Sequence, residues 1–146
     1  MREEPGLIEL TRAKFLFGSI PPVVVGTVTA VSITGEFRLY GLFLAYFIAV
    51  NLQISMQVYN DIYDTYQGSD NEISAKSDYS GGSGILLEYP GLTPKMFTIG
   101  RVTLLLASLG SAVLLSTIDR ALWIPFFLIT VLGVFLVRFY NAPPFQ

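Results

Sequence analysis

The side chains best suited to chemistry in this sequence of 146 residues lie in one short run. Asn60, Asp61 and Asp64 stand close together, and Asp70 follows them. If the preceding helix continues this far, positions three and four apart lie on one face, so the first three side chains share it. Two carboxylates so close repel each other, and a cation between them would stabilise the pair. The spacing therefore predicts a metal site.

Mg²⁺ is the ion that this cluster is expected to bind. The sequence has no Cys and no His, which excludes thiolate and imidazole ligands, a thiol nucleophile and the usual general base. Ligands that are oxygen alone favour a hard ion, Mg²⁺ before Ca²⁺. Because Mg²⁺ is typically held by one or two carboxylates together with substrate phosphates, the cluster suggests a substrate that carries a diphosphate.

A solvated helix end is the other interpretation of two aspartates three positions apart. The residues that precede the cluster weigh against it, because Gln53 and Gln57 lead into the cluster along an apolar segment. Polar side chains at membrane depth usually belong to functional sites. We therefore favour a functional cluster over a solvated helix end.

The elements that position the cluster are expected to be membrane-spanning helices. The sequence is 52% hydrophobic and 14% charged, with a mean hydropathy of +0.57, which exceeds what a soluble domain of this size needs. Uncharged apolar runs of about 17 to 20 residues are long enough to cross a bilayer core of about 30 Å. They predict an all-α fold, a polytopic transmembrane helix bundle in one domain, 1–146. The expected spans are about residues 15–33, 39–58, 96–116 and 122–139.

Two local features of these spans predict how they are built. The pair Pro21–Pro22 near the start of the first span predicts an irregular or kinked first turn. Small residues let membrane helices approach closely, and Gly26 and Ala30 in the first span or Ala107 and Gly110 in the third span are candidates for such contacts. Ordinary membrane-helix composition explains these small residues equally well.

Charge placement predicts the orientation in the membrane. A polar loop over residues 60–95 is expected to lie on the same side as both termini, with two short turns on the other side. Seven of the nine basic residues fall on the loop side, so the positive-inside rule predicts a protein of the cytoplasmic membrane with this loop in the cytoplasm. The glycine-rich Ser80–Gly84 is interpreted as a hinge of this loop, with a backbone anion nest as the alternative. A net charge of -2 without a basic stripe excludes nucleic acid as a partner.

The run from Asn60 to Asp70 resembles the first aspartate-rich motif of the UbiA superfamily of intramembrane prenyltransferases, N-D-x-x-D followed by a further Asp. The resemblance covers nearly the whole chain, since it extends to R-x-K-F-L from Arg12, to P-P-V-V-V-G-T, to S-G-G-S-G and to the F-Y-N-A-P-P-F ending. The common form of the motif has its third Asp where this sequence has Gly68. The G-x-D pattern that ends in Asp70 is instead similar to the 1,4-dihydroxy-2-naphthoate polyprenyltransferase branch. Gly68 is expected to end the helix, so that Asp70 need not share its face.

The resemblance implies transfer of a polyprenyl group from an allylic diphosphate donor to an aromatic or related acceptor, in quinone biosynthesis of the menaquinone type or in isoprenoid lipid biosynthesis. Mg²⁺ would be the cofactor. The implied catalytic residues are Asn60, Asp61 and Asp64, and the implied metal ligands are Asp61, Asp64 and Asp70. The candidate substrate contacts are Lys76, Tyr140 and Asn141.

The sequence also departs from the family that it resembles. The resemblance implies a bundle of about nine helices with two aspartate-rich motifs, whereas this sequence predicts four spans and contains the first motif alone. We therefore expect an N-terminal part of a larger bundle that is inactive without its C-terminal half. A small four-helix transporter or channel and a noncatalytic bundle subunit are the alternatives. The transporter is disfavoured because the first, third and fourth predicted spans carry no carboxylate.

Overall fold

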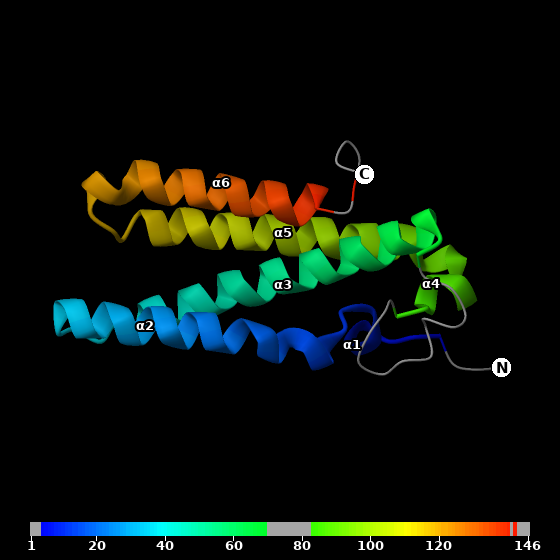
Figure 1. Cartoon of the computed structure of the whole chain (residues 1–146), viewed down its shortest axis with the longest axis horizontal. Helices are drawn as coiled ribbons and strands as arrows, with labels where there is room; N and C mark the ends of the chain where they lie inside the picture. Colours follow the sequence, from blue (N-terminus) through cyan, green and yellow to red (C-terminus); the bar gives the residue numbers. More distant parts are fainter. Residues whose placement is uncertain (1–3, 70–82, 141, 143–146) are drawn as a thin grey trace.

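Helices joined by short turns, without any strand, make up the residues that the structure, a computed structural model, describes: 4–69, 83–140 and 142. Four helical segments in this part are long and apolar enough to cross a membrane, which confirms the expected all-α, membrane-embedded class. They are Ala13–Thr34, Leu39–Gln67, Pro90–Leu115 and Arg120–Phe139. The segments form two hairpins that meet along the middle of the molecule (Figure 1).

The first hairpin begins irregularly. A short helix α1, Leu7–Leu10, is followed by a 3-10 helix η1, Ala13–Ser19, and then by α2, Ile20–Thr34. Both prolines, Pro21 and Pro22, lie in the first turn of α2. Proline is tolerated there because the first N–H groups of a helix have no partner within it. The span therefore begins irregularly, as expected, but in the 3-10 helix that precedes the prolines, which themselves fit the first turn of α2.

The second segment of this hairpin, α3, is longer than expected. It runs over Leu39–Gln67 and ends at Gly68, which adopts the left-handed conformation at φ 73°, so the predicted end at Gly68 is confirmed. The helix thus continues past residue 58, the predicted end of the span, and Tyr59 and Ile62 are buried on this continuation. The carboxylate cluster thus belongs to the last turns of a helix and not to a loop.

The second hairpin follows a short connection. The helices α4, Ile85–Glu88, and η3, Pro90–Leu92, lead into α5, Thr93–Leu115. A turn through η4, Arg120–Leu122, then leads into α6, Trp123–Phe139. The expected loop over 60–95 is therefore wrong at both of its ends, where α3, α4 and the start of α5 are helical. Figure 1 places α1, α4 and the C-terminal end of α6 at one end of the bundle and the two hairpin turns at the other.

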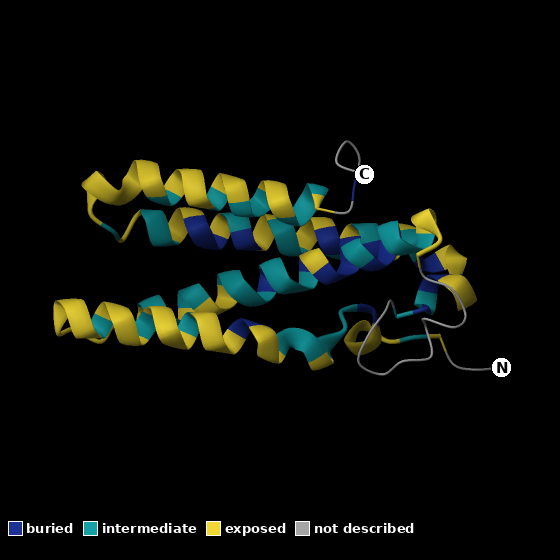
Figure 2. Ribbon diagram, in the orientation of Figure 1, coloured by how far each residue is buried: buried dark blue, intermediate teal, exposed yellow. Residues whose placement is uncertain are grey.

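Buried side chains gather on the two inner helices and around α4 (Figure 2). Neither α2 nor α6 contributes a buried residue, whereas α3 and α5 both do. One apolar core lies at the α4 end of the bundle. Its buried members are Leu10, Val58, Tyr59, Ile62, Leu86, Leu92 and Met96. The apolar outer faces of α2 and α6 suit hydrocarbon, in which exposed apolar side chains cost nothing.

Small residues decide how closely α3 and α5 approach. A Cβ on Gly110 would lie 3.0 Å from Ile48 Cγ1 and 3.1 Å from Phe47 Cδ1, and Ala107 is buried beside it. The expected close approach at Ala107 and Gly110 is confirmed. No described atom outside its own helix backbone and chain neighbours comes within 4 Å of a Cβ built on Gly26, so the same expectation is wrong there. Ala30 is likewise exposed.

Candidate functional site

The last turns of α3 carry Asn60, Asp61 and Asp64 on a continuous helix, as the spacing requires. The side-chain amide Nδ2 of Asn60 donates a hydrogen bond to Asp64 Oδ2 one turn later. An amide that donates to a carboxylate fixes the orientation of both groups. The structure therefore brings Asn60 and Asp64 together in the way that a shared helix face predicts.

Asp61 is the most deeply buried charged side chain of the cluster. The residue is 1% exposed, and its Oδ1 lies 3.0 Å from Nη1 of Arg12. The backbone N–H of Ser83 donates a second hydrogen bond to the same oxygen at 3.3 Å. The other oxygen, Oδ2, is buried and has no hydrogen-bond partner among the described residues. Asp61 therefore links α3 to the segments that carry Arg12 and Ser83, while its Oδ2 has no hydrogen-bond partner among the described residues.

Arg12 is the residue that sequence reasoning did not assign to the site. It adopts the left-handed conformation, φ 48° and ψ 46°, which costs a non-glycine residue about 1–2 kcal/mol. Its guanidinium also lies over the ring of Phe15, 4.6 Å from the centroid. The sequence marks Arg12 as a basic residue before the first span and as the start of the R-x-K-F-L run, but it indicates no partner, because Asp61 stands 49 positions away.

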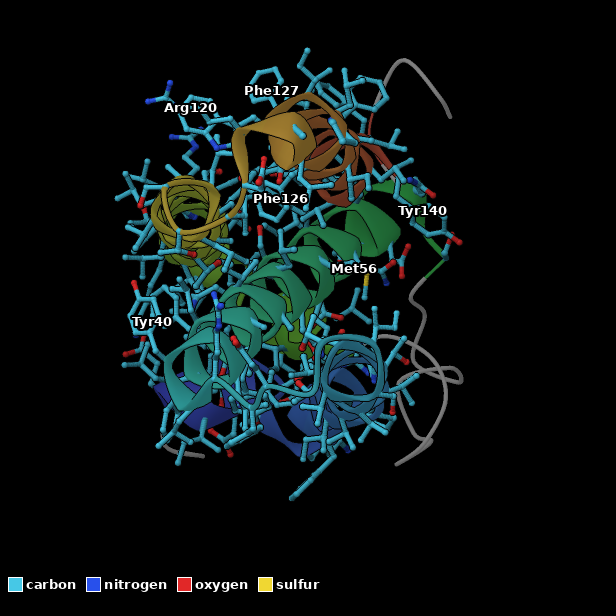
Figure 3. The ribbon with its side chains drawn as sticks, turned by 90° about the vertical axis from the view of Figure 1, so that its left-hand side faces the viewer. Tyr40, Met56, Arg120, Phe126, Phe127 and Tyr140 are labelled. Atoms are coloured by element: carbon cyan, nitrogen blue, oxygen red, sulfur yellow. The ribbon has the colours of Figure 1, made fainter. Side chains whose placement is uncertain are left out.

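A cavity of about 390 Å³ lies beside the cluster, between the N-terminal segment, α3 and the end of α6. Its lining includes Arg12, Phe15, Gln53, Gln57, Asn60 and Tyr140. Met56 also borders the cavity, and Figure 3 shows Met56 and Tyr140 on the same side of the molecule. Tyr140, a candidate substrate contact, thus shares one cavity with Asn60, although it is 71% exposed.

A second arginine, Arg138, connects α6 to α3 next to the cluster. Arg138, in the last turn of α6, donates from Nη1 to the hydroxyl of Tyr63 on α3 at 2.9 Å. Its guanidinium also lies 5.0 Å from the ring centroid of Tyr59 and 5.3 Å from that of Phe139. Cation–π contacts of this kind are strongest where water is excluded. Arg138 therefore holds α6 against the helix that carries the cluster.

Three of the predicted site residues lie outside the described part of the chain. They are Asp70, Lys76 and Asn141, and the hinge or nest predicted for Ser80–Gly84 falls there in part. Within residues 4–69, 83–140 and 142, no group of three or more His, Cys, Asp or Glu side chains could hold a metal ion. The three-aspartate metal site therefore stays a prediction.

Comparison with known proteins leaves the family open. No protein-family model, no curated protein and no solved structure matches this chain. The membrane-embedded helical fold is shown by the structure, whereas the resemblance to the UbiA prenyltransferases rests on the quoted sequence motifs. That resemblance stays a prediction.

Proposed function

We propose that this chain is the donor-binding part of a membrane prenyltransferase, and that its α4 end binds the Mg²⁺-diphosphate head of an allylic polyprenyl donor. The observation that carries the proposal is the environment of Asp61. Asp61 is 1% exposed and pairs with Arg12 through one oxygen, while its other oxygen is buried without a hydrogen-bond partner among the described residues. Such an environment is unusual for a carboxylate unless a further partner binds. Buried ionisable groups in membrane helices are functional candidates for the same reason.

Mg²⁺ fits the donor set that the described residues offer. Asp61 Oδ2 is a hard oxygen ligand that is buried and has no hydrogen-bond partner among the described residues, and Asp64 presents a carboxylate on the same face of α3. Mg²⁺ needs only one or two carboxylates because phosphate and water complete its coordination. Asp61 and Asp64 would hold the ion, and the ion would neutralise charge on the departing diphosphate. Asn60 would keep Asp64 oriented through the hydrogen bond between them.

Arg12 supplies the second requirement of such a site, a fixed positive charge beside the donor head group. Its side chain is 15% exposed and it borders the cavity beside the cluster. A guanidinium can serve two anions at once because it carries five N–H donors. Arg12 would therefore hold Asp61 and a diphosphate oxygen together, which stabilises negative charge where it develops as the allylic bond breaks.

The proposal is tested by binding of geranyl diphosphate to the full chain in lipid nanodiscs, with and without Mg²⁺. Binding is expected to require Mg²⁺ and to weaken roughly 100-fold in Asp64→Asn, the upper end of losses seen when metal-site groups are altered. Asp119→Asn is the matched control, because Asp119 caps η4 at the other end of the bundle and an Asn can cap in the same way. Equal binding by the wild-type chain and Asp64→Asn, or binding that ignores Mg²⁺, contradicts the proposal.

The proposal also includes the orientation, with the α4 end in the cytoplasm. It is supported by the excess of basic residues on that side. Because the chain has no Cys, one cysteine can be added at a time. In intact cells a membrane-impermeant maleimide is expected to label Thr117→Cys, at the far turn, and to spare Gln67→Cys, at the end of α3. The reverse labelling pattern would mean that the orientation is inverted.

A further inference from the structure

A cavity of about 530 Å³ lies between α5 and α6, two helices that run side by side (Figure 1). Apolar side chains make up most of its lining, which extends along α6 from Phe126 to Phe139. Ser108 also lines it, but its hydroxyl donates to the carbonyl oxygen of Leu104 in its own helix. The cavity shares no lining residue with the cavity beside the carboxylate cluster, so the two are separate spaces.

The cavity has the length and the depth of an acyl chain. Phe126 and Phe139 are thirteen positions apart, which at 1.5 Å per residue is roughly 20 Å along the helix. One leaflet contributes half of a hydrocarbon core of about 30 Å. Water does not occupy an apolar space at that depth, whereas lipid chains surround it. Hydrocarbon is therefore the content that the middle of this cavity suits.

Arg138 marks the end of the cavity that lies at a membrane surface. It borders the cavity in the last turn of α6. Arg120, in the turn at the other end of α6, precedes it by eighteen positions, so roughly 27 Å separates the two along the helix. That separation is close to the thickness of the hydrocarbon core. The two arginines therefore lie near opposite surfaces, and Arg138 lies at the level of lipid head groups.

A second cation, Arg101 on α5, stands at the same end of the cavity. It precedes Leu104, which lines the cavity, by three positions and so shares its face of α5. The guanidinium of Arg101 lies 5.7 Å from the ring centroid of Phe97. The ring of Phe97 contacts that of Tyr59, which carries the guanidinium of Arg138 at 5.0 Å. Neither arginine forms an ion pair within the described part of the chain, so both charges can serve an anion.

We infer that the cavity between α5 and α6 binds an acyl chain of an anionic phospholipid, whose phosphate lies between Arg101 and Arg138. Charge complementarity carries the inference, because two unpaired cations end an apolar cavity at the level of lipid head groups. Arg138 gives one N–H to Tyr63, and a guanidinium has five, so donors remain for phosphate oxygens. Basic sites between membrane helices bind anionic head groups in this way.

The head-group contact is tested by native mass spectrometry of the full chain in a non-ionic detergent. Dioleoyl phosphatidylglycerol and dioleoyl phosphatidylcholine have the same chains and differ in net charge. The wild-type chain is expected to bind the anionic lipid roughly 25-fold more tightly, about fivefold for each arginine. Arg101→Gln and Arg138→Gln should each keep a preference of about fivefold, and the double variant should keep none. Arg120→Gln, labelled in Figure 3, is the matched control at the opposite surface and should keep the full preference.

The contact with the acyl chain is tested by filling the cavity. Ala112 lines the cavity, so Ala112→Trp should weaken the binding of both lipids roughly tenfold, the loss of about ten carbon–carbon contacts. Val113→Trp is the matched control, because Val113 is 46% exposed on the same helix and lies outside the lining. Unchanged binding in Ala112→Trp overturns the inference, since the head group alone would then hold the lipid.

Three other results overturn the inference. Equal binding of the two lipids by the wild-type chain removes the charge contact, and an undiminished preference in the double variant places that contact elsewhere. A dimer that Ala112→Trp abolishes gives the cavity to a second copy of the chain. If circular dichroism shows that Arg138→Gln does not fold, the exposed Arg101 decides, and the preference must fall about fivefold in Arg101→Gln.

Competition with geranyl diphosphate and Mg²⁺ separates this inference from the proposed function, on which it does not depend. Geranyl diphosphate is expected to leave bound phosphatidylglycerol in place, because the two cavities share no lining residue. Displacement of the lipid gives the cavity to the tail of a prenyl donor and overturns the inference. A lipid preference that depends on both arginines, without any binding of geranyl diphosphate, supports the inference and contradicts the proposed function.

Discussion

Two ion pairs between an arginine and a carboxylate lie at opposite ends of the bundle. They differ in burial and in how far apart their partners stand in the sequence. Arg12 and Asp61 lie 3.0 Å apart at the α4 end, with side chains 15% and 1% exposed. Arg38 and Glu36 lie 2.7 Å apart in the turn between α2 and α3, with side chains 74% and 63% exposed. The shorter pair is the weaker one, because water and salt screen an exposed pair. The burial of the two side chains, and not the distance between their charged atoms, therefore decides which ion pair contributes more to stability.

The difference extends to what each pair connects. The Glu36–Arg38 pair joins positions two apart within one turn, so the chain holds the partners close in any case. The Arg12–Asp61 pair joins positions 49 apart and fixes the N-terminal segment against α3. Taking two charges out of water is costly, and that cost makes the loss of either partner severe. The α4 end is thus the part of the molecule where polar groups are held in place by the tertiary structure.

The largest effect is expected when one partner of the buried pair is removed. Arg12→Ala leaves Asp61 buried without its cation and should lower the free energy of unfolding by about 3–5 kcal/mol. Unfolding in mixed detergent micelles, followed by circular dichroism, measures it. Arg38→Ala is the control and should change the same quantity by about 0–1 kcal/mol, since it breaks only the exposed pair. Similar losses in the two variants would remove the contrast between the ends.

Replacing both partners sharpens the same comparison. The double variant Arg12→Leu with Asp61→Leu leaves no unpaired charge and should therefore unfold less readily than Arg12→Ala by about 2 kcal/mol or more. Geranyl diphosphate binding should nevertheless be lost. A double variant that binds the diphosphate as the wild-type chain does would show that the pair has only a structural role.

An intermediate effect is expected where helices α3 and α5 pack. Gly110→Leu forces its side chain into Ile48 and Phe47 and should cost about 1–3 kcal/mol of unfolding free energy by overpacking. Gly26→Leu is the control on α2, because a Cβ on Gly26 meets no described atom within 4 Å outside its own helix backbone and chain neighbours. It should be neutral or stabilise the chain by up to about 1 kcal/mol, since leucine favours helix over glycine. A costly Gly26→Leu would reveal a partner on the α2 face.

The smallest effect concerns the cations on aromatic rings. Arg138→Gln removes a guanidinium that donates to Tyr63 and lies over Tyr59, and it should cost about 1–2 kcal/mol of unfolding free energy. Arg120→Gln removes the cation over Trp123 at the opposite end, 5.9 Å from the ring centroid, and should cost about 0.5–1 kcal/mol at this exposed site. Both free energies of unfolding are measured in the same micelles. A larger loss in Arg120→Gln than in Arg138→Gln would contradict the conclusion that the α4 end is the better packed one.

The sequence predicted the local elements of this protein well. Apolar runs long enough to span a bilayer predicted the four helices, and Gly68 predicted the end of α3 because glycine adopts the left-handed conformation without steric cost. The spacing of Asn60 and Asp64 predicted their shared face. These features depend on neighbours along the chain, so the order of the residues is enough to derive them.

The same approach failed where burial depends on distant segments. The loop expected over 60–95 was placed too early because Asn60, Asp61 and Asp64 look like the start of a polar loop. Ile62, which lies between them, is buried in the same apolar core as Leu10 and Leu86, and such burial stabilises the continued helix. Polarity alone did not reveal that Arg12 and the backbone of Ser83 contact Asp61.

By itself the sequence determined that the chain is helical, that it suits a membrane and that its carboxylates gather at one helix end. Only the tertiary structure decided that Arg12 pairs with Asp61 and that Arg138 donates to Tyr63. It also decided that the amide of Gln57 is buried without a hydrogen-bond partner among the described residues. The physical reason is that helix periodicity is a property of neighbouring residues. The partner of a buried charge is instead set by how segments far apart in the chain pack, and the order of the residues does not state that packing.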